Sequence, residues 1–84
     1  MSTSPERISS PEDEVVSALS HWLAFHLGNA ELRARLRAIG TDGLSDDQAA
    51  AVAELLAELD EAPEGTRGVL EMHVRETLEA VALG

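Results

Sequence analysis

The chain of 84 residues is long enough for one domain, and it contains no cysteine, which excludes disulfide bonds and thiolate metal sites. Its six basic residues are all arginine and stand against 16 acidic residues, which gives a formal net charge of −10. An acidic surface repels nucleic-acid phosphates and anionic lipids. We therefore expect no nucleic acid and no membrane as partner, and we expect another protein, preferably a basic one.

The N-terminal sequence lacks the basic start and apolar run of a secretory signal peptide. The longest stretch without a charged residue, 15–30, includes two serines and two histidines. It is shorter than the roughly 20 apolar residues that span a membrane. We expect a cytoplasmic protein, and the absence of cysteine agrees with a reducing compartment.

The first helix is expected over 11–27. Ser10 is suited to cap it, Pro11 suits its first position, and Gly28 supplies a left-handed stop. Apolar residues recur within it at helical spacing: Val15, Val16, Leu19, Trp22, Leu23 and Leu27.

A short second helix is expected over 30–39, with Asn29 as its N-cap and Gly40 at its end. Its apolar side consists of Leu32, Leu36 and Ile39. The third helix is expected over 46–61, because S-D-D-Q is a capping box formed by Ser45 and Gln48. Its apolar stripe consists of Val52, Leu55, Leu56 and Leu59.

The fourth helix is expected over 66–83. Its start could lie at Pro63 or after Thr66, and Gly65 and Gly68 favour the later start because glycine lowers helix stability. Its apolar stripe consists of Leu70, Val74, Leu78 and Val81.

No segment shows the sustained alternation of a strand. We therefore expect an all-α fold, a small four-helix bundle-like domain over 10–84 with short loops. Residues 1–9, rich in serine, threonine and proline, are expected to form a disordered N-terminal tail.

Two groups of residues are candidates for binding a partner protein. The apolar residues outside the stripes include Ala18, beside the first stripe, and three candidates for an exposed partner surface: Phe25, Met72 and Leu83. Three carboxylates mark the outer face of the third helix: Asp47, Glu54 and Glu58. The core of so small a domain is limited, and burying the exposed apolar residues between subunits would extend it. This favours a homodimer or a larger assembly. We expect Arg33, Arg35 and Arg37 to pair with the acidic third helix or with a neighbouring subunit.

The histidines offer a second hypothesis, a ligand-binding or pH-sensing site between the first and fourth helices, lined by Trp22, His26 and His73. On a continuous helix His26 lies in the apolar face, where protonation would place a charge in the core. His21, five residues earlier, points nearly the opposite way, so we expect no shared site with His26. We expect no metal site and no cofactor, because the histidines lack the spacing of three or four residues that places two ligands side by side. We expect no catalysis, because the sequence contains no phosphate-binding loop and no nucleophile with a base and an acid.

The segment I-G-T-D-G-L-S, followed by an acidic amphipathic helix, resembles the segment of acyl carrier proteins around the phosphopantetheine serine, L-G-x-D-S-L. The resemblance covers about 25 residues and implies a four-helix acyl carrier with a phosphopantetheine arm attached to a serine. The attachment serine of the family falls on Gly43 of this chain, and Ser45 is expected to cap the third helix. The sequence thus predicts a non-catalytic protein-interaction module, with a small-ligand or acyl-carrier-like protein as the alternative.

Overall fold

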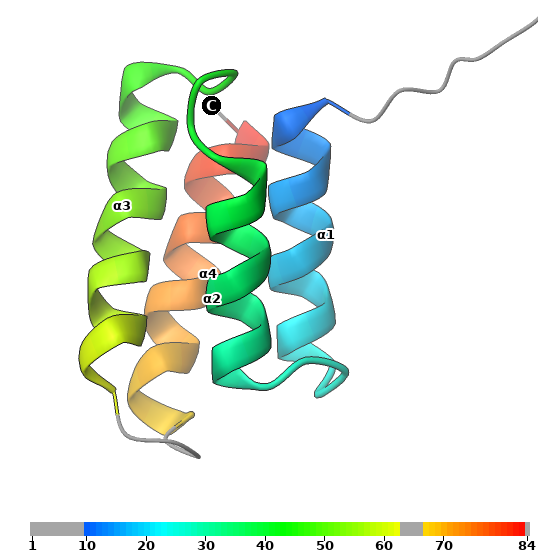
Figure 1. The fold of residues 1–84 in the computed structure, drawn as a ribbon, viewed down its shortest axis with the longest axis vertical. Helices are drawn as coiled ribbons and strands as arrows, with labels where there is room; N and C mark the ends of the chain where they lie inside the picture. Colours follow the sequence, from blue (N-terminus) through cyan, green and yellow to red (C-terminus); the bar gives the residue numbers. More distant parts are fainter. Residues whose placement is uncertain (1–9, 63–66, 84) are drawn as a thin grey trace, which may run out of the picture.

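The computed structural model describes residues 10–62 and 67–83 and places four helices in them, with no strand in this part of the chain. These are α1 (Pro11–Leu23), α2 (Asn29–Ile39), α3 (Asp46–Glu61) and α4 (Gly68–Leu83). Successive helices run in opposite directions and lie side by side (Figure 1). The prediction of an all-α four-helix domain is confirmed. The expected tail over 1–9 and the alternative helix starts at Pro63 and Thr66 lie outside the described residues.

Each helix packs against two others, in the cyclic order α1, α2, α3, α4 and back to α1. The buried apolar side chains form one core, and all of them except Ala18 come from the predicted stripes: Val15, Ala18, Leu19, Trp22, Leu32, Leu36, Val52, Leu55, Leu59, Leu70, Val74 and Val81. Ala18 was expected outside the core but is fully buried. The spacing of three and four residues puts each stripe on one side of its helix, so the four stripes meet at the centre. None of the helices in the described ranges is long and apolar enough to cross a membrane.

The link between α1 and α2 differs from the sequence-based prediction. Helix α1 ends at Leu23 and not at residue 27, and Phe25 adopts the left-handed conformation, with φ of 67°. Gly28, expected to be the left-handed stop, has φ of −86° and caps the N-terminus of α2, while Asn29 is the first residue of that helix. The prediction placed the stop at the glycine because glycine adopts this conformation without strain.

Two backbone hydrogen bonds explain the early end of α1. The N–H of His26 donates to the carbonyl of His21 at 2.8 Å, and the N–H of Phe25 donates to the carbonyl of Trp22 at 3.0 Å. This pair of bonds defines a Schellman motif, in which the residue after the C-cap is left-handed. Phenylalanine occupies the position that glycine usually takes.

Gln48 joins three helices at the opposite end of the bundle. Its backbone N–H donates to Ser45 Oγ and its Oε1 accepts from the Ser45 N–H, which confirms the predicted capping box. Its Nε2 donates to Glu12 Oε2 at 2.7 Å and to the Val81 carbonyl at 3.0 Å. That carbonyl lies in the last turn of α4, where no amide of the helix is available to it. The side chain is only 1% exposed.

Replacing Gln48 with alanine should therefore cost more stability than replacing Ser45. We expect Ser45→Ala to lower the free energy of unfolding by about 1 kcal/mol, the usual value of an N-cap. Gln48→Ala should lower it by roughly 2–4 kcal/mol, because it also leaves the buried Val81 carbonyl without its donor. Urea denaturation followed by circular dichroism measures both values. Equal losses would show that the contacts of Gln48 with α1 and α4 contribute nothing.

Candidate functional site

The outer side of α3 and α4 carries a continuous group of carboxylates. Asp47, Glu54 and Glu58 are spaced by seven and four residues, so they lie along one exposed line of α3, as predicted. Glu76 and Glu79 are exposed on α4. We call these five residues the acidic face.

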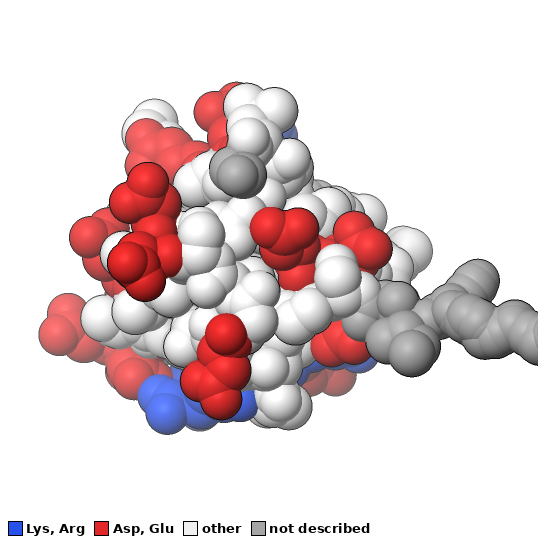
Figure 2. Space-filling view, turned by 90° about the horizontal axis from the view of Figure 1, so that it is seen from above, with Lys and Arg blue, Asp and Glu red and all other residues white. Residues whose placement is uncertain are grey.

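A shallow hollow occupies the part of the acidic face near the end of α4. It has a volume of about 500 Å³, is open to solvent, and is lined by Asp47, Glu76, Glu79, Ala80 and Leu83. Leu83 is 85% exposed, so an aliphatic side chain stands among the carboxylates. Viewed along the bundle from the end where α3 begins, carboxylates spread over the surface and most visible arginine atoms gather at one edge (Figure 2).

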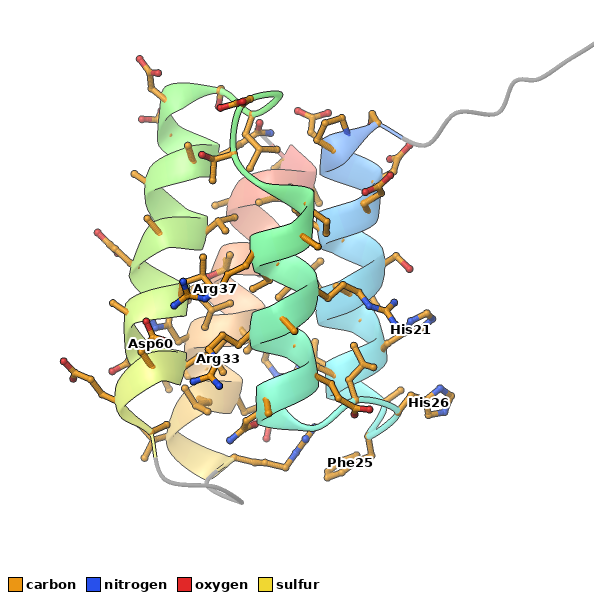
Figure 3. All side chains as sticks on the ribbon, viewed as in Figure 1. His21, Phe25, His26, Arg33, Arg37 and Asp60 are labelled. Atoms are coloured by element: carbon orange, nitrogen blue, oxygen red, sulfur yellow. The ribbon has the colours of Figure 1, made fainter. Side chains whose placement is uncertain are left out.

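The arginines of α2 lie on a different side of the bundle. Arg37 Nη2 donates to both carboxylate oxygens of Asp60, at 2.8 and 2.7 Å, and Arg33 Nη1 lies 3.5 Å from Asp60 Oδ1 (Figure 3). The predicted pairing with the third helix is confirmed for these two arginines. Arg35 borders a separate hollow beside the first turns of α1. The arginines of α2 therefore leave the acidic face uncompensated.

Few ion pairs reach the acidic face itself. Glu58 Oε1 lies 3.3 Å from His73 Nδ1 of α4. The one arginine within α4, Arg75, pairs with Glu71 on the same helix, at 2.9 Å. No ion pair formed within residues 10–62 and 67–83 involves the other four members of the acidic face. Their charges therefore face solvent.

The three apolar candidates for a partner surface are exposed, but they do not form one surface. Phe25 is 77% exposed at the α1–α2 corner, and Leu83 lies at the opposite end of the bundle, where α4 ends (Figures 1 and 3). Met72 lies in the first half of α4. A fourth exposed large apolar residue, Val69, was not predicted; it lies in the first turn of α4, next to Leu70, the first residue of the stripe.

The expected site between α1 and α4 is not assembled. Trp22 is buried in the core and donates its indole N–H to Asn29 Oδ1 at 2.8 Å. His26 is exposed in the α1–α2 link, so its predicted place in the apolar face is wrong, because α1 ends three residues earlier. His73 faces Glu58 on the α3 side of α4. The three side chains therefore point into different surroundings.

The structure brings together a pair of histidines that the sequence analysis separated. The imidazole rings of His21 and His26 lie with centroids 6.0 Å apart and planes inclined by 28°. Both side chains are exposed and lie near each other at the corner (Figure 3). The prediction that they point in opposite directions assumed a continuous helix, and the Schellman motif ends that helix between them.

Arg67 fastens this corner to the start of α4, and no local pattern in the sequence indicates it. Its guanidinium carbon lies 3.9 Å from the centre of the Trp22 ring and 4.3 Å from that of Phe25. Its side chain also donates to the carbonyls of Trp22 and Leu27. The contacts span about 40 residues of sequence, so only the folded chain reveals them.

The segment that resembles acyl carrier proteins serves as the turn before α3. A side chain at position 43 would collide with the ring of Pro11, so this position is packed against α1. The hydroxyl of Ser45 is engaged as the N-cap.

Searches against protein-family models, curated proteins and solved structures found no match to the chain. Among the described residues, no group of three or more histidine, aspartate or glutamate side chains is placed to hold a metal ion.

The left-handed conformation of Phe25 predicts an unusual response to substitution. Phe25→Gly and Phe25→Ala both remove the ring, but only alanine keeps the strain of a positive φ. We expect the glycine variant to be more stable than the alanine variant by roughly 1 kcal/mol in urea denaturation.

Ala24, the neighbouring residue, is the matched control, because its φ of −85° suits any residue. Ala24→Gly should lower stability by roughly 0.5–1 kcal/mol, the opposite preference. If the same residue, alanine or glycine, gave the more stable protein at both positions, the described conformation of the corner would be contradicted.

Proposed function

We propose that this protein is a non-catalytic interaction module whose acidic face receives a basic, amphipathic helical segment of another protein. The observation that carries the proposal is the hollow beside Leu83, which combines uncompensated carboxylates with an exposed aliphatic side chain. A helix with one basic and one apolar side presents the complementary groups in the same arrangement.

Charge supports a basic occupant in particular. Helix α3 contains six acidic residues and no basic one, and α4 adds three acidic residues and one arginine. Like charges held close together repel one another, so a cationic partner relieves this repulsion and is attracted over a distance as it approaches. The aliphatic side chain adds apolar area to bury, which charge alone does not supply.

The same charges disfavour a second copy of this chain on the acidic face. A symmetric dimer through this face would set Glu54 and Glu58 against carboxylates of the other copy. The expected homodimer, based on the exposed apolar residues Phe25, Met72 and Leu83, stays a prediction; of these three only Leu83 borders the hollow of the acidic face. The carrier alternative gains no supporting observation, because Ser45 caps α3 and position 43 has no room for a side chain.

A designed lysine–leucine amphipathic helix of about 18 residues is a suitable probe, and nuclear magnetic resonance titration of the labelled protein locates its binding. We expect chemical-shift changes to concentrate on the acidic face and on Leu83. The double variant Glu54→Lys/Glu76→Lys should weaken binding by about tenfold or more, because each reversal replaces an attraction with a repulsion.

A control variant with the same change in net charge distinguishes specific binding at the acidic face from nonspecific electrostatic attraction of the peptide. Glu14 and Asp42 are exposed outside α3 and α4, so Glu14→Lys/Asp42→Lys should weaken binding by much less. Equal weakening by the two double variants, or shift changes spread over the whole surface, would contradict the proposal.

A further inference from the structure

We propose that His21 and His26 form a binding site for one divalent transition-metal ion of the kind that prefers nitrogen ligands, such as Ni²⁺, Cu²⁺ or Zn²⁺. This site lies at the α1–α2 corner and is independent of the acidic face. The Schellman motif produces it: His21 and His26 are the two positions joined by its longer hydrogen bond, and this bond brings their side chains together.

The separation of the two rings suits a shared ion. A metal–nitrogen bond to imidazole is about 2.0–2.1 Å, and the ring centre lies roughly 1 Å behind the nitrogen. Two imidazoles on one ion therefore have centroids about 4.5–6.5 Å apart, depending on the angle at the metal. The observed 6.0 Å lies near the upper end of this range and the rings are stacked, so they must turn and approach each other by about 1 Å to share an ion with tetrahedral angles. Both side chains are exposed, so their torsion angles are free to turn one nitrogen of each ring towards the ion.

The corner is fixed before any ion binds. Arg67 stacks on the Phe25 ring and donates to the carbonyls of Trp22 and Leu27, so the turn that carries His26 is tied to α4. The protein also retains a strained φ at Phe25. A backbone held in this way loses little freedom when the ion binds, which favours affinity.

Two protein ligands leave the other coordination positions to water. No third histidine or carboxylate within the described ranges completes a group around this pair. Imidazole pairs bind ions of the later first-row metals, whereas Mg²⁺ requires oxygen ligands. The selectivity of the site therefore distinguishes it from loose attraction of cations to a chain of net charge −10.

The test titrates the full chain with NiCl₂ or ZnCl₂ in a buffer that does not bind metals. Isothermal titration calorimetry should give one ion per chain, and excess ion should raise the Tm by about 4 °C or more. His21→Asn and His26→Asn should each weaken binding by about 100-fold, because each removes one arm of a two-point attachment.

The third histidine supplies the matched control. His73→Asn, which removes the histidine paired with Glu58, should leave binding unchanged, and MgCl₂ should leave the Tm unchanged. The proposal is overturned by the absence of binding, by binding as tight as that of the unmodified chain in either His21→Asn or His26→Asn, or by one ion for every two chains. A loss of binding in His73→Asn would also overturn it.

Discussion

The buried indole of Trp22 is the constraint on which one end of this bundle depends. An indole N–H placed in an apolar core costs free energy unless it finds an acceptor, and Asn29, the first residue of α2, provides one at 2.8 Å. Forming this hydrogen bond fixes the distance between the last turn of α1 and the first residue of α2. The guanidinium of Arg67 then covers the ring, which joins the start of α4 to the same point. One side chain thus orders three helices.

The helices and their buried sides were predictable because they depend on local spacing. The stripe from Val52 to Leu59 and the capping box of Ser45 and Gln48 are properties of short segments, and both are observed. The end of α1 was not predictable, because glycine at position 28 is the better local stop. The contacts of Trp22 with Asn29 and Arg67 lie at this end of α1 and form only in the folded chain, so no local pattern includes them.

The candidate sites also differ in whether local sequence or only the folded chain reveals them. The acidic line of α3 follows from the helical period, so the sequence alone located it. The contribution of Glu76 and Glu79 required the neighbouring position of α4, and the pairing of His21 with His26 required the Schellman motif. The bundle consequently presents two different surfaces, an acidic face on α3 and α4 and a histidine-bearing corner between α1 and α2, each with its own chemistry.

The hydrogen bond between Trp22 and Asn29 holds the α1–α2 corner. A double-mutant cycle with Trp22→Phe and Asn29→Ala measures the energy of that bond directly, with far-ultraviolet circular dichroism as the signal because Trp22 is the only tryptophan. We predict a coupling free energy of about 1 kcal/mol or more, in the range of a buried hydrogen bond. A coupling near zero, with the two substitutions simply additive, would show that this bond does not hold the corner.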